Sequence, residues 1–202
     1  MGRYDVTQTD AALRRLLETT TNPRHRHLIQ VCDLYRCLRL AGRYREIFTS
    51  GITVERPVWH FNALGLDLIL DGREEIETIW EEWTKTGQCI FYAAGEKLAV
   101  GDEMVASTVL LYQQTPGQSL AAIEGGVDTA ATYLIANVVD LTWLFDDQGR
   151  VIRQCSWEID PSRRQLIKLD AADVLSPQQA AQQLDPLIKS AAEHVHARTV
   201  TG

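Results

Sequence analysis

Apolar residues recur along the chain at two different spacings, and these predict helices near both ends with strands between them. From Arg24 to Gly42 the apolar side chains repeat every three or four residues, which is the period of an amphipathic helix. Stretches with the same period predict further helices at 10–18, 44–48, 71–86 and 176–197. Elsewhere apolar and polar side chains alternate, or β-branched residues dominate, as is typical of strands. The expected strands cover 52–61, 89–94, 104–113, 132–145 and 151–159.

The order of these elements predicts the fold class α+β: a cone-shaped, curved antiparallel sheet wrapped around N-terminal helices, with an added C-terminal helix. Strands and helices do not alternate as in βαβ units, which argues against a parallel sheet. Gly149 suits the positive φ of a tight turn, so 141–160 is expected to form a hairpin. Pro57 donates no ladder hydrogen bond, which predicts an edge strand or a bulge. Such a sheet leaves a closed-ended pocket, whose mouth the C-terminal helix would cover unless it packs against a second subunit.

This pattern divides the chain into three segments. Residues 1–23 form an N-terminal helical arm, residues 24–160 the cone domain, and residues 161–202 a C-terminal extension that carries the last helix. Glycines gather in 116–129, which we interpret as a long loop that could act as a lid over the pocket.

Composition narrows the classes of partner. Acidic residues outnumber basic ones by 27 to 20, giving a net charge of −7. Binding a polyphosphate or an anionic membrane requires a basic face, so we expect neither nucleic acid nor membrane as a partner. The chain contains no apolar run near the roughly 18 residues that span a bilayer and no secretory signal pattern, which predicts a cytoplasmic protein.

The sequence contains no pattern typical of a metal or cofactor site, so we expect neither. The four cysteines lack metal-binding or redox spacing and are expected to be buried free thiols. His25 and His27, like His194 and His196, stand two residues apart on predicted helices, where such side chains diverge. Glycine motifs for phosphates or dinucleotides are also absent from the sequence.

Three segments carry a resemblance to a known superfamily: the helix 27–41, the run Thr53-Val54-Glu55-Arg56-Pro57-Val58, and the hairpin 141–160. Over residues 27–160 the chain resembles the nuclear transport factor 2-like (NTF2-like) superfamily, and within it the polyketide cyclase-like and ketosteroid isomerase-like branches. Ketosteroid isomerases place a proton-shuttling Asp where this chain has Arg56. A guanidinium stays protonated at neutral pH, so double-bond isomerisation by that route is not expected. Cyclase and dehydratase relatives pair a helix Asp with a strand His, and the matching helix position here is Cys37.

The resemblance implies four catalytic residues that face one pocket. Glu158 would be a carboxylate whose burial suits acid-base work, and His60 would carry protons near neutral pH. Tyr35 would donate a hydrogen bond to a developing oxyanion, and Arg56 would hold a carboxylate or enolate oxygen. Each position has a plainer alternative, with Glu158 or His60 at the surface and Tyr35 in the core. The resemblance also implies pocket-lining side chains at Asn137, Val139, Leu141, Trp143, Gln154 and Ser156.

These residues predict a cofactor-independent isomerase, cyclase or dehydratase that acts on an apolar small molecule of polyketide, steroid or terpenoid type. The alternative is a non-catalytic small-molecule-binding or dimerisation module of the same fold. Trp157 and Ile159, on the outer face of the last strand, predict a homodimer through that face. A core filled by Phe61, Leu111 and Trp143 would argue against the enzyme.

Overall fold

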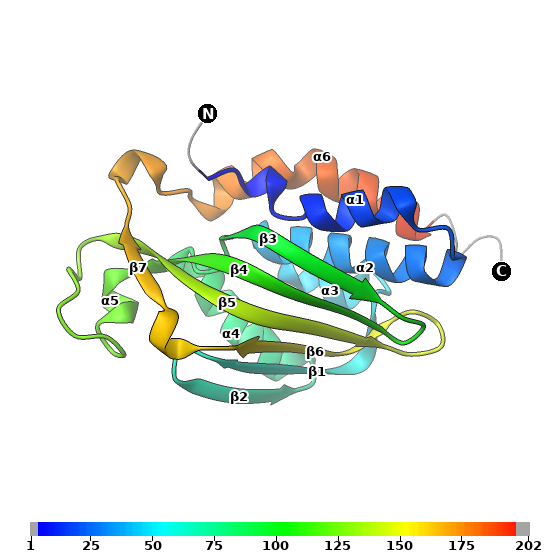
Figure 1. Cartoon of the computed structure of the whole chain (residues 1–202), viewed down its shortest axis with the longest axis horizontal. Helices are drawn as coiled ribbons and strands as arrows, with labels where there is room; N and C mark the ends of the chain where they lie inside the picture. The colour runs from blue at the N-terminus through cyan, green and yellow to red at the C-terminus, as the bar shows by residue number, and fades with distance from the viewer. Residues whose placement is uncertain (1–3, 197–202) are drawn as a thin grey trace.

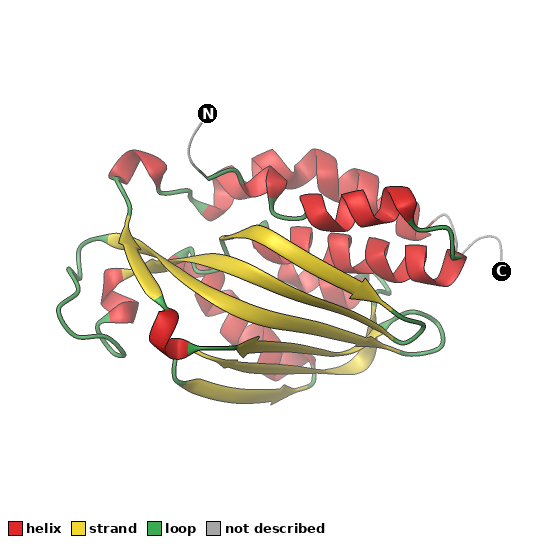
Figure 2. Cartoon of the chain, viewed as in Figure 1, coloured by secondary structure: helices red, strands yellow, loops and turns green. Residues whose placement is uncertain are grey.

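The computed structural model describes residues 4–196, which form one curved sheet with helices packed against one of its faces (Figures 1 and 2). The sheet order is β2-β1-β6-β5-β4-β3, and β7 pairs with the first part of β5. Its strands are β1 (Thr53–Ala63), β2 (Leu66–Asp71), β3 (Phe91–Val100), β4 (Met104–Pro116), β5 (Thr132–Phe145), β6 (Val151–Glu158) and β7 (Gln165–Lys168). The helices are α1 (Ala11–Thr19), α2 (Pro23–Leu40), α3 (Tyr44–Thr49), α4 (Arg73–Thr86), α5 (Gly117–Leu120) and α6 (Pro177–His196).

The arrangement confirms the predicted α+β cone, with one refinement. All neighbouring strands are antiparallel except β1 and β6, which run parallel, so the sheet is mixed. The parallel pair arises because β5 and β6 form a hairpin, and β6 then returns along β1 in the same direction. Pro57 lies in a bulge, since Thr53 pairs with Val151 while Val58 already pairs with Arg153. Strand β1 lies inside the sheet, between β2 and β6, and β2 forms the edge.

Strand β2 is an element that the sequence pattern did not predict. It follows β1 through a two-residue turn at Leu64 and Gly65, both with positive φ (59° and 75°). Helix α4 consequently begins after β2, with Gly72 at its N-cap instead of Asp71.

Helices α2, α3 and α4 lie behind the sheet in Figure 1, and α1 and α6 lie together beyond α2. Helix α6 packs on α2. None of the helices within residues 4–196 is long and apolar enough to cross a membrane.

Candidate functional site

A small cavity lies inside the cone, between α2 and the inner face of the sheet. Its volume is about 30 Å³, which is enough for one or two water molecules, since one water needs roughly 10–15 Å³ on this measure. Most of its wall is apolar, and four polar side chains interrupt it. The lining residues are Arg39, Phe61, Ala63, Leu64, Phe91, Leu111, Gln113, Asn137, Val139, Leu141 and Ser156.

Helix α2 brings Arg39 to this cavity because it stands on the same stripe of the helix as buried Leu28, Cys32 and Tyr35. Four aromatic rings surround the guanidinium. Its central carbon lies 5.1 Å from the ring centroid of Trp59, and the other three distances are similar. They are 5.5 Å to Trp80, 5.4 Å to Trp83 and 5.6 Å to Phe91. These contacts are cation–π interactions, which stabilise the charge without neutralising it.

The charge of Arg39 has no counter-charge within the part of the chain that the structure describes. No carboxylate there forms an ion pair with it, and its Nε is buried without a hydrogen-bond acceptor. Burial lowers the pKa of Arg39, because a desolvated cation is less favourable than a hydrated one. Arg36, one turn earlier on α2, is by contrast paired with Asp10 and Glu96, each at 2.7 Å.

A carboxylate is hydrogen-bonded to one residue of the cavity wall, Leu64. Glu158, at the end of β6, accepts a hydrogen bond from the backbone N–H of Leu64 at 2.9 Å and is paired with Arg164 at 2.7 Å. Burial alone would raise the pKa of Glu158, but hydrogen bonds from Arg164, from the Leu64 N–H and from Asn137 outweigh it and lower that pKa. Glu158 is therefore ionised and engaged at neutral pH.

The backbone of this cone matches several solved structures. An NTF2-like protein from Anabaena variabilis has a TM-score of 0.51 and 8% identity, over 70% of this chain and 95% of that one. The chain has the NTF2-like fold. Two proteins described as SnoaL-like polyketide cyclases also match with TM-scores of 0.51 and 11% identity. The one from Shewanella putrefaciens covers 78% of this chain and 90% of its own, and the one from Jannaschia covers 70% and 91%.

At these identities the likeness concerns the fold alone, and it confirms the NTF2-like fold that the resemblance implied. No protein-family model and no curated protein sequence matches the chain.

The NTF2-like cone brings four of the six expected pocket residues to the cavity: Asn137, Val139, Leu141 and Ser156. Trp143 and Gln154 share the inner face with them but are packed in the core and do not line the cavity. The side-chain amide of Gln154 donates to the Ser156 hydroxyl at 2.7 Å.

The four residues expected to be catalytic do not converge on this cavity. Arg56, on the bulge of β1, is largely exposed and forms an ion pair with Asp71 at 2.9 Å. His60 lies on the outer face of the sheet, where Asp67 is 2.7 Å from its Nε2 and the ring of Trp157 meets it edge-on. Inner positions of β1 are instead occupied by Trp59 and Phe61, because the bulge sets the alternation of the strand.

Tyr35 is buried in the core, with its ring edge-on to that of Trp80, and does not line the cavity. Burial raises the pKa of its hydroxyl. Its position therefore corresponds to the core alternative considered for this residue.

A second group of titratable side chains lies between α1 and α2. Asp10, Asp33 and Cys37 bring possible metal-ligating atoms within 4.8 Å of one another, but Arg36 already pairs with Asp10. Burial raises the pKa of Asp33 to about 7, and it also raises the pKa of the Cys37 thiol, which is a poor ligand when protonated. The Asp33 side chain is 15% exposed and forms an ion pair with Arg14 at 3.2 Å.

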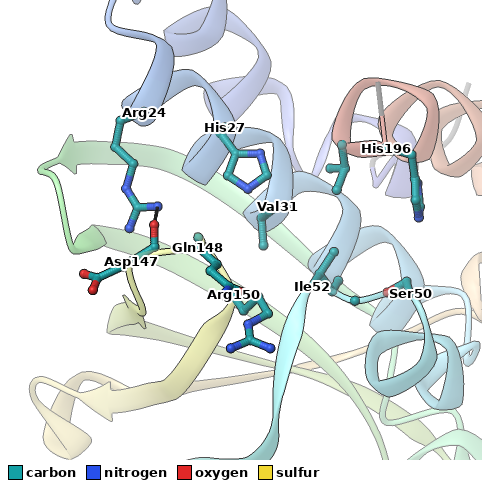
Figure 3. Close-up of a pocket in the computed structure, with 12 residues that line it drawn as sticks. Arg24, His27, Val31, Ser50, Ile52, Asp147, Gln148, Arg150 and His196 are labelled. Atoms are coloured by element: carbon teal, nitrogen blue, oxygen red, sulfur yellow. Dashed lines mark hydrogen bonds between the residues drawn. The ribbon is translucent and has the colours of Figure 1, made fainter. Parts of the chain in front are cut away.

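A larger pocket, of about 610 Å³, lies outside the cone, where the start of α2 meets the β5–β6 turn and the end of α6 (Figure 3). Figure 3 shows Arg24 donating to the carbonyl oxygen of Asp147, at 3.0 Å, and Arg24 also reaches the carbonyl of Asp146 at 2.6 Å. Arg150 pairs with the Asp146 carboxylate at 2.7 Å. Because both arginines already have partners, we place the candidate site in the smaller cavity, next to Arg39.

Proposed function

We propose that the chain is a small-molecule-binding protein whose ligand, a largely apolar compound, occupies the NTF2-like cone. The observation that carries this proposal is the cavity itself, in which apolar walls surround a few converging polar groups: Arg39, Gln113, Asn137 and Ser156. Ligand sites in proteins have this composition, with the polar groups setting orientation.

A ligand larger than two water molecules must displace part of the wall. The turn at Leu64 is the segment best placed to move. A leucine at positive φ costs about 1–3 kcal/mol, so this turn is held closed by its surroundings and not by its own preference. Because Leu64 lines the cavity and its N–H is held by Glu158, we expect ligand entry to shift this turn.

Turnover by a cofactor-independent isomerase, cyclase or dehydratase is the second candidate. A buried cation beside a largely apolar cavity suits an oxyanion that develops during such a reaction, which is the specific observation that favours it. The polyketide cyclase descriptions of proteins with this fold are in keeping with it. Binding is preferred because His60 and Arg56 face outward and Glu158 is already paired. The catalytic roles of Tyr35, Arg56, His60 and Glu158 remain predictions.

Binding is tested by a panel of neutral and charged aromatic and alicyclic compounds, read out as the shift in melting temperature. Ser156→Leu places a larger side chain in the cavity, and Cys155→Leu makes the same kind of change on the opposite face of β6. We expect compounds that stabilise the wild type and Cys155→Leu but not Ser156→Leu. Equal responses of the two variants would place the ligand elsewhere.

Turnover is then tested on each bound compound by mass spectrometry and chromatography of the incubated mixture. Conversion by the wild type that is lost in Glu158→Gln, with binding retained, would establish the second candidate. Binding without conversion supports the first.

A further inference from the structure

Buried hydrogen-bond donors without an acceptor are found on Arg39 and on two of the rings that contact it. Besides Arg39 Nε, the indole N–H groups of Trp59 and Trp80 are buried without an acceptor within residues 4–196. Both rings contact the guanidinium, at 5.1 and 5.5 Å from its central carbon. Buried donors are nearly always satisfied in folded proteins, and a cluster of unsatisfied ones requires an explanation.

We propose that the ligand of the cone is a small organic anion, a carboxylate attached to an apolar body, and that Arg39 binds its charged group. This inference rests on the proposed function and names the class of ligand. A guanidinium presents a planar fork of N–H donors that matches the two oxygens of a carboxylate. The apolar body would lie against Phe61, Leu111 and Val139, which line the same cavity.

The cavity is too small for the whole ligand. About 30 Å³ admits a group no larger than the carboxylate itself, so the apolar body requires the wall to move. Water in the cavity is the competing explanation for the missing acceptors, since two or three hydrogen bonds to water would satisfy them without any ligand.

Stability separates a binding role from a structural role for Arg39. A buried charge without a counter-ion disfavours folding, whereas cation–π contacts favour it. If Arg39 is kept for an anion, Arg39→Met, which fills similar space without charge, should melt at the same temperature as the wild type or higher. If the arginine serves only to hold the four rings, the same variant should melt at a clearly lower temperature.

The experiment compares acetate and benzoate with acetamide and benzamide, which are neutral compounds of nearly the same shape. Binding is followed by NMR through the Arg39 Nε–H resonance and the methyl groups of Leu111, Val139 and Leu141. We expect the carboxylates to shift these signals and to bind at least about tenfold more tightly than the amides. Arg39→Met should abolish that preference, while Arg43→Met, which removes an arginine paired with Glu46, should preserve it.

Three outcomes would overturn the proposal. If amides shift the NMR signals of the cavity methyl groups as strongly as carboxylates do, the ligand need not be an anion, although the cone remains the ligand site. If Arg39→Met still prefers carboxylates, a residue other than Arg39 binds the carboxylate group. If neither series moves the cavity signals, water is the occupant and the proposed function fails as well. Should Arg39→Met not fold, the structural role is established for Arg39, and the wild-type comparison of carboxylate with amide still decides the class of ligand.

Discussion

The carboxylate of Glu158 accepts a hydrogen bond from the backbone N–H of Leu64 at 2.9 Å, which joins the end of β6 to the turn between β1 and β2. Leu64 has a φ of 59°, an unfavourable conformation for a leucine, and it lines the cavity of the cone. The pair therefore links the conformation of the cavity wall to the ionised state of one buried carboxylate.

Removing the partner of this carboxylate should destabilise the protein strongly. Glu158 is almost fully buried and Arg164 largely so, and Arg164→Ala would leave a buried charge unpaired. We expect the free energy of unfolding to fall by about 3 kcal/mol in denaturant titrations. Lys168→Ala is the matched control, because Lys168 pairs with Asp128 at the surface and should have little effect. Equal losses in the two variants would show that the Glu158 pair is not desolvated.

Stability should depend on pH through Asp33. Burial raises its pKa to about 7 in the folded chain, so its protonation stabilises the fold. That contribution is complete below the ordinary aspartate pKa of about 4 and is lost as the pH rises to about 7, which amounts to a few kcal/mol. Asp33→Asn should therefore match the wild type near pH 4.5 and melt at a higher temperature at pH 8. A difference that stays constant between these pH values would contradict the raised pKa.

The outer face of the sheet should mediate a homodimer. Ile69, Trp157 and Ile159 lie there or beside it with 58%, 48% and 50% of their surface exposed, which is unfavourable for side chains of this size in a monomer. Light scattering at micromolar concentration should give twice the 22.7 kDa of the chain. Trp157→Glu should yield monomers, while Ile123→Glu, at an exposed isoleucine in the loop after α5, should not. A wild type of 22.7 kDa would refute this prediction.

His60 should not contribute to ligand binding, because it lies on the face of β1 opposite to the cavity. His60→Ala should retain the affinity of the wild type for any compound that the cone binds, as measured by calorimetry. A loss of more than about tenfold would mean that the ligand reaches the outer face, and the role of His60 as proton carrier would regain support.

Most of the fold follows from periodicity, but two strands, β2 and β7, were not predicted, and the absence of β2 from the prediction has a local cause. The stripe of apolar residues predicted α2 within two residues of its observed ends, because the helix buries one face along its whole length. Strand β2 was missed because its turn consists of Leu64 and Gly65, whereas two-residue hairpin turns usually contain Asn-Gly or Asp-Gly.

The site was predictable only in part. Strand alternation sorted the residues into two faces, and the resemblance indicated that the face with Asn137, Leu141 and Ser156 is the inner one. The number of extra residues in the bulge at Pro57 cannot be read from sequence, and it decides where Arg56 and His60 point. Arg39 was missed although a signal existed. A charged residue four positions after Tyr35 interrupts the apolar stripe of α2, and a charge in such a stripe is either paired, as Arg36 is, or kept for a ligand.

The central claim is that the cone, and not the larger outer pocket, takes the ligand. The most direct test is methyl NMR of the wild type with a compound that raises its melting temperature. Methyl groups line both the cone cavity and the outer pocket, so their signals show which of the two binds the compound. Shifts confined to Leu111, Val139 and Leu141 are the predicted result. Shifts confined to Val31 and Ile52, which line the outer pocket, would contradict it.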